Sequence, residues 1–164
     1  MSESIKKIGI PTATIGAAIM MLAPMLLQGA FAAPTIHGGE CTTVDDNLVC
    51  EFDVSGLGGA TTATGTLTGT ATITTGCVTP PGNNEPQGLQ DSTVAVLETS
   101  TVNVEGGRAT FTFATDFNAE DLRDCPSANM TPVIVCATFT DLQLEVDPNA
   151  GPTRTFNLPD ESSC

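Results

Sequence analysis

Residues 62–77 read TATGTLTGTATITTGC, and threonine occupies every even position from 62 to 74. The odd positions are mostly small or apolar; they include Leu67, Ala71 and Ile73 and end at Cys77. Successive side chains of a β-strand point to opposite faces of a sheet. The stretch therefore predicts one long strand, or two strands joined by a bend at Gly69, with a threonine outer face and an apolar inner face.

The same alternation recurs elsewhere in the chain. It places Leu48, Cys50, Phe52 and Val54 on an inner face, and residues 109–113 alternate in the same way. Residues 133–146 change parity: Val133, Val135, Ala137 and Phe139 alternate first, and Leu142, Leu144 and Val146 follow after a one-residue slip. Such a slip indicates a β-bulge, which we place at Thr140-Asp141.

The remaining segments complete an all-β fold. A polar loop is expected from Pro80 to about Asp91, short strands over 93–97, 101–105 and 153–156, and one helical turn within 116–125 with Asn118 as its N-cap. Seven to nine short strands with almost no helical periodicity predict an antiparallel, Ig-like β-sandwich.

The N-terminus has the pattern of a secretory signal peptide. Lys6 and Lys7 precede an apolar stretch over residues 15–27, and small residues around Ala32 and Ala33 mark the cleavage site, with cleavage after Ala32 favoured. An uncleaved anchor and a pilin-type leader are alternatives, but prolines interrupt the apolar stretch. We therefore expect a signal helix in a signal peptide over 1–32, a flexible tail over 33–40 and one sandwich domain over 41–164.

The net charge of the chain and its expected export limit the classes of function that it can have. Removing residues 1–32 takes away both lysines, so the mature chain has 18 acidic residues against three arginines and a formal net charge of −15. So acidic a surface disfavours nucleic acid and anionic membranes. We expect a secreted or cell-surface protein with no stable membrane insertion after cleavage.

The cysteine count predicts three disulfides in an exported chain. Cys41 and Cys50 lie symmetrically about Asp45-Asp46, so a tight hairpin turn there brings them face to face. Cys77 ends the threonine strand and Cys125 ends an acidic segment, which favours a bridge between them. Cys136 then pairs with Cys164 and holds the C-terminal tail.

Several short motifs stand out along the chain: Val54-Ser55-Gly56-Leu57-Gly58, the alternating strand that ends at Cys77, Pro80-Pro81-Gly82-Asn83-Asn84, Gly107-Arg108-Ala109-Thr110-Phe111 and Cys125-Pro126. Together they resemble a family of small exported prokaryotic β-proteins of unknown function. The resemblance covers about residues 41–147 and implies the sandwich and the Cys77–Cys125 bridge, but no activity. Asn129-Met130 stands where the family pattern has an aromatic residue, so packing at that loop can differ.

Catalytic and metal motifs are scarce in this sequence. The single histidine, His37, falls in the expected solvated tail, and there is no tryptophan or tyrosine for stacking on sugars. The best metal candidate is an acidic segment whose oxygen ligands suit calcium: Asp116, Asn118, Glu120, Asp121 and Asp124. A capped turn with a solvated acidic face is the simpler interpretation of the same residues.

These observations predict a non-enzymatic structural or interaction module at or outside the cell surface, with no cofactor other than calcium. A protein partner or self-association is expected, and a pilus-like filament subunit that donates residues 33–40 to a neighbour is one version. A ligand-binding or calcium-binding module is the alternative. An extracellular hydrolase is a third interpretation.

Overall fold

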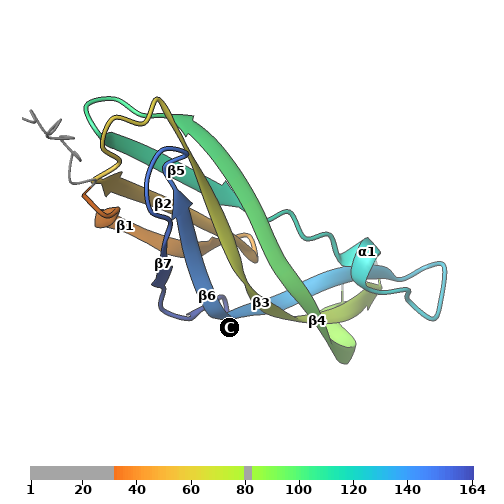
Figure 1. Cartoon of the computed structure of the whole chain (residues 1–164). Helices are drawn as coiled ribbons and strands as arrows, with labels where there is room; N and C mark the ends of the chain where they lie inside the picture. The colour runs from red at the N-terminus through yellow and green to blue at the C-terminus, as the bar shows by residue number, and fades with distance from the viewer. Residues whose placement is uncertain (1–31, 80–82) are drawn as a thin grey trace, which may run out of the picture.

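Two antiparallel sheets and one short helix make up the computed structural model, which describes residues 32–79 and 83–164 (Figure 1). The first sheet has the order β1-β2-β5, with β1 at Thr35–Val44, β2 at Asn47–Ser55 and β5 at Arg108–Ala114. The second has the order β4-β3-β6-β7, with β4 at Asn83–Asn103, β3 at Thr62–Thr79, β6 at Thr131–Asp147 and β7 at Arg154–Asn157; β8 at Glu161–Ser162 also pairs with β6. Helix α1 spans Ala119–Leu122. The predicted β-sandwich is confirmed.

The threonine strand is the middle of the second sheet and has the predicted register. β3 pairs with β4 on one side and β6 on the other, and it runs as one strand past Gly69. Leu67 is 1% exposed and Ala71 and Ile73 are fully buried, whereas the even-numbered threonines are half-buried or exposed. The apolar face of β3 therefore forms the side of the hydrophobic core that the second sheet supplies.

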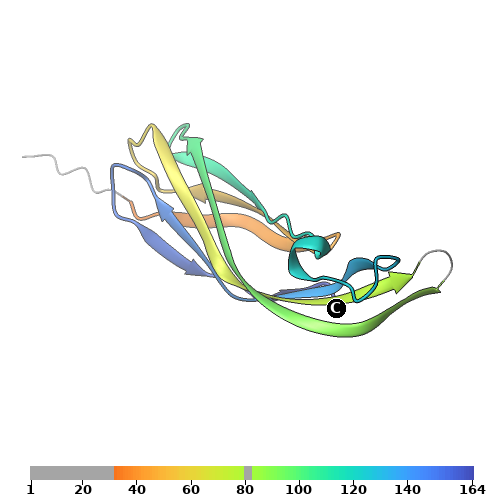
Figure 2. The same cartoon turned by 90° about the vertical axis from the view of Figure 1, so that its right-hand side faces the viewer.

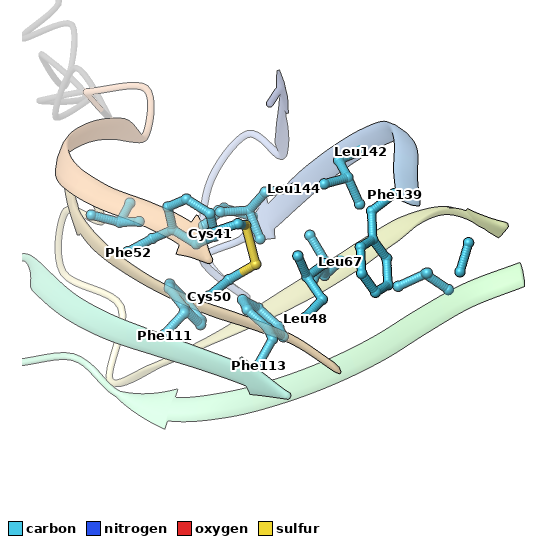
Figure 3. Close-up of a cluster of buried hydrophobic side chains, with 14 of the residues drawn as sticks. Cys41, Leu48, Cys50, Phe52, Leu67, Phe111, Phe113, Phe139, Leu142 and Leu144 are labelled. Atoms are coloured by element: carbon cyan, nitrogen blue, oxygen red, sulfur yellow. A yellow bond between two sulfur atoms is a disulfide. The ribbon is translucent and has the colours of Figure 1, made fainter. Parts of the chain in front are cut away.

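Phenylalanines from the first sheet pack on this apolar face of β3. Phe52 of β2 and Phe111 and Phe113 of β5 point toward Leu67 and Leu144 of the second sheet (Figure 3). The Phe111 and Phe113 rings stack with centroids 6.3 Å apart. These rings come so close to β3 that only glycine fits at position 65.

The second sheet is much longer than the first. β3, β4 and β6 curve beyond the end of the first sheet, and the connection that carries α1 lies over this extension (Figure 2). Phe117 of the connection stacks on Phe139 of β6 at 6.2 Å, and Cys125 is bonded to Cys77 of β3. We name the extension, residues 70–79, 83–95 and 131–140, the distal arm.

Two predicted irregular segments prove to be strand. The predicted polar loop over 80–91 is wrong for residues 83–91, which belong to β4, and β4 continues without a break to Asn103. The predicted flexible tail is wrong from Thr35 onward, because residues 35–40 are the first half of β1 and pair with β2. In both cases pairing with a neighbouring strand satisfies backbone groups of a polar segment that has no alternation of its own.

The parity of β6 changes twice rather than once. The predicted bulge is confirmed, since the register shifts between Thr140 and Gln143 and Asp141 has a φ of +53°. A second shift lies between Ile134 and Cys136. It turns Val135 outward, so Val135 is 39% exposed and its predicted inward position is wrong.

All three predicted disulfides are present: Cys41–Cys50, Cys77–Cys125 and Cys136–Cys164. Asp45 and Asp46 both have positive φ, as a two-residue hairpin turn requires, and Cys41 lies opposite Cys50 as expected. The predicted signal peptide lies outside the described residues, apart from Ala32.

Replacing Gly65 by alanine is expected to lower the free energy of unfolding by about 1–3 kcal/mol, because the new Cβ would overpack the core. That atom would lie 2.7 Å from Cδ1 of Phe111 and 3.0 Å from Cζ of Phe113. Urea unfolding measures the change. Gly59→Ala is the control, since its Cβ would meet nothing within 4 Å; equal stability of the two variants would contradict this packing.

Removing Cys77–Cys125 is expected to destabilise the protein more than removing Cys41–Cys50. The bridges join residues 48 and 9 positions apart. On the chain-entropy model they contribute about 4 and about 3 kcal/mol respectively. The measurement is urea unfolding of Cys77→Ala/Cys125→Ala against Cys41→Ala/Cys50→Ala, and a smaller loss in the first variant would refute the expectation.

Candidate functional site

The acidic segment proposed as a calcium site lies on the surface beside the distal arm. Asn118 is the N-cap residue of α1, as predicted, but its side chain makes no capping hydrogen bond. Glu120 and Asp121 lie in the first turn of α1, and Asp116 and Asp124 lie on either side of it; all five side chains are exposed. Among the described residues, no three histidine, cysteine, aspartate or glutamate side chains lie close enough together to hold a metal ion. Calcium binding stays an untested prediction.

Arg123, the basic residue of this segment, points toward the sheet instead of pairing with its acidic neighbours. The Arg123 Nη1 donates to the backbone oxygens of Thr75, at 3.1 Å, and Gly88. Both carbonyls belong to the part of the β3–β4 ladder where the register shifts between Thr75 and Cys77. Arg123 therefore satisfies main-chain acceptors that the irregular ladder leaves open, and its role is to hold α1 on the arm.

A polar groove on the outer face of the first sheet is the better candidate for a ligand site. It has a volume of about 540 Å³, and its walls come from strands β1, β2 and β5, the end of β4 and the β4–β5 turn. Its charged and polar side chains come from His37, Asp53, Ser55, Asn103, Glu105, Arg108 and Thr110. A volume of this order suits a small molecule.

A β-bulge in β1 brings His37 to this groove. Ile36 pairs with Val54 and Gly38 with Asp53, so His37 is the extra residue. Bulges of this kind re-aim a side chain. The His37 Nε2 is hydrogen-bonded to the Ser55 hydroxyl of β2, so His37 does not lie in a solvated tail. Sequence reasoning missed this site, and the only local signal was Gly38-Gly39, which allows the irregular backbone after His37.

The groove holds charges of both signs in adjacent rows of the sheet. Ser55 lies directly opposite Arg108, and Asp53 lies opposite Thr110. The Thr110 hydroxyl donates to Asp53 Oδ1 at 2.7 Å, which holds that carboxylate in place. His37, Ser55 and Arg108 thus form a donor row. Glu105 lies at the end of this row, directly opposite Arg108 across the β4–β5 turn, and Asp53 lies in the next row.

Arg108 differs from the two other arginines of the chain, Arg123 and Arg154. Arg123 is bonded to two carbonyls, and Arg154 donates to the Pro34 oxygen and lies over the Phe156 ring, 5.2 Å from its centroid. Within residues 32–79 and 83–164, the Arg108 guanidinium has no hydrogen bond or ion pair that would hold it in this way. Its five N–H donors are available to a ligand.

The chain matches no protein-family model, no curated protein and no solved structure. The resemblance to small exported prokaryotic β-proteins stays a prediction. In the part of the chain that the structure describes, no helix has both the length and the apolar character needed to cross a lipid bilayer.

Arg123→Met is expected to loosen the distal arm locally by about 1–3 kcal/mol, because two main-chain acceptors lose their donor. Hydrogen exchange should speed up at residues 75–77 and 86–90 while β2 and β5 keep their protection. Arg108→Met serves as the control, since its side chain supports no such contact. Unchanged exchange in the arm of Arg123→Met would refute this role.

Proposed function

We propose that this chain is an exported, non-enzymatic module that associates with a second copy of itself through the free edge of β4. The signal-like N-terminus and three disulfides fit an oxidising compartment outside the cytoplasm. The observation that carries the proposal is the length of β4: 21 residues, paired with β3 on one side only. An edge strand presents unpaired N–H and C=O groups that a further strand can take up.

The β4 edge lacks the features that normally protect an edge strand. Such edges are blocked by lysine, proline, bulges or inward-pointing charges. From Gln90 to Asn103 the β4 register against β3 is continuous, and this stretch has no lysine or proline. Its acidic residues are Asp91 and Glu98, so residues 92–97 are uncharged. Leu97 on this stretch is 68% exposed.

A two-fold antiparallel pairing centred on Ala95 suits the charges of two such edges. It places Leu97 of one copy opposite Thr93 of the other, Asp91 opposite Thr99, and Glu98 opposite Ser92. Like charges directly opposite each other destabilise a strand pair, and this register has none. An isologous contact of this kind closes on itself as a dimer rather than extending as a filament.

The filament version in which residues 33–40 are donated to a neighbour has less support. Residues 35–40 already pair with β2 of their own chain, and Arg154 donates to the Pro34 oxygen at 3.0 Å. Donation would break both sets of contacts. The β4 edge needs no such rearrangement.

The dimer is expected to be weak and to strengthen with salt. A stable interface buries about 800 Å² on each partner, and pairing residues 91–99 alone buries less, which places the dissociation constant in the micromolar range or above. Two chains of the same strongly acidic charge repel each other, and salt screens that repulsion. Sedimentation velocity over a range of protein and salt concentrations measures both effects.

Leu97→Asp is expected to weaken the dimer about tenfold or more, because it adds a charge to each side of the uncharged stretch. Val44→Asp on β1 is the matched control, since Val44 is also exposed, at 52%, but lies on the first sheet. A chain that stays monomeric at every concentration, or a Leu97→Asp variant that associates as the parent does, would overturn the proposal.

A further inference from the structure

We propose that the groove on the outer face of the first sheet binds a small zwitterion of the α-amino acid class. The ligand carboxylate lies along the donor row of His37, Ser55 and Arg108, and the ligand ammonium lies against Asp53 in the adjacent row. This inference is independent of self-association, because Asn103, the residue through which β4 lines the groove, lies outside the stretch 91–99 that pairs in the dimer.

The donor row suits a carboxylate. Ser55 and Arg108 are cross-strand partners, so their side chains leave the sheet side by side. Guanidinium groups bind carboxylates in a bidentate fork, and a hydroxyl or an imidazole N–H adds a further donor. The His37–Ser55 hydrogen bond holds the two smaller side chains of the row in place before a ligand arrives.

The two carboxylates that line the groove distinguish a zwitterion from a simple anion. Asp53 and Glu105 line the same groove as Arg108, so a bare anion would meet two carboxylates there. The net charge of the whole chain repels anions further. A ligand with an ammonium group next to its carboxylate offers each row an opposite charge. Because its own net charge is zero, the acidic chain does not repel it at long range.

The groove dimensions limit the ligand to a small one. The volume of about 540 Å³ is at the low end for ligand sites, and the apolar lining residues Val54 and Ala109 have side chains buried in the core below. Polar atoms make up only slightly more than half of the accessible surface of the groove. The charged side chains, rather than a deep apolar pocket, would hold the ligand, which favours a short or absent side chain, as in glycine or alanine.

The test is a calorimetric titration of the full mature chain with glycine, acetate and methylamine as separate probes. Glycine is expected to bind, and acetate and methylamine, which offer one charge each, are expected to bind at least about tenfold more weakly, since each lost charge-assisted hydrogen bond is worth roughly 1.4 kcal/mol or more. Acetate binding as tightly as glycine would replace the proposal with a simple anion site, and methylamine doing so would replace it with a cation site. No glycine binding would overturn it outright.

Single substitutions test which row of the groove binds the carboxylate of glycine and which binds its ammonium group. Arg108→Gln and Asp53→Asn are each expected to weaken glycine binding about tenfold or more. Asp53→Asn keeps an oxygen for the Thr110 hydroxyl, so the sheet is preserved. Arg154→Gln and Asp141→Asn, which change the same residue types away from the groove, are expected to bind glycine as the parent does. Unchanged affinity in both groove variants would refute the assignment.

Discussion

The structure depends on the contact between the apolar face of β3 and the phenylalanines of β5. β3 has a paired strand on each side, so its parity fixes the inner faces of β4 and β6 as well. A slip of one residue would bury a row of threonine hydroxyls and expose Leu67 and Ile73. Because Phe111 and Phe113 lie close to Gly65, the register is also fixed along the strand. The side-chain pattern of one strand thereby selects the arrangement of the whole second sheet.

The second sheet is longer than the first, so the part of it that extends beyond the first sheet has to be covered by another segment of the chain. Here the β5–β6 connection supplies it with three kinds of contact: the Phe117 ring on Phe139, the Arg123 guanidinium on main-chain oxygens, and the Cys125 bridge. None of these is a large apolar surface. Beyond the buried residues at its base, such as Ile73 and Ala137, the distal arm is thus held by a few specific bonds, while the sandwich proper is held by packing. The two parts therefore respond differently to substitution.

Alternation along the sequence was sufficient to predict the central strand, the β1–β2 hairpin and the bulge near Asp141. The turn at Asp45-Asp46 and the disulfide Cys41–Cys50 follow from spacing alone, because hairpin geometry is local. The first half of β4 could not be predicted in this way. Its residues are polar on both faces, and only pairing with an extended β3 makes them a strand. The groove was missed for a related reason: a bulge at His37 and a register against β5 bring it together, and neither leaves a motif in the sequence.

The placement of the disulfides determines how the folded chain would respond to tension between its ends. Each bridge is covalent, so the segments it encloses, 41–50, 77–125 and 136–164, cannot lengthen under load. A force applied at Cys164 is transmitted through its disulfide to Cys136 of β6. The extensible stretches of the described chain are then 33–40, 51–76 and 126–135. The longest of them contains most of β3, which can yield only by shearing rows of hydrogen bonds on both of its sides. The largest part of the extensible length therefore includes the strand that is paired on both of its sides.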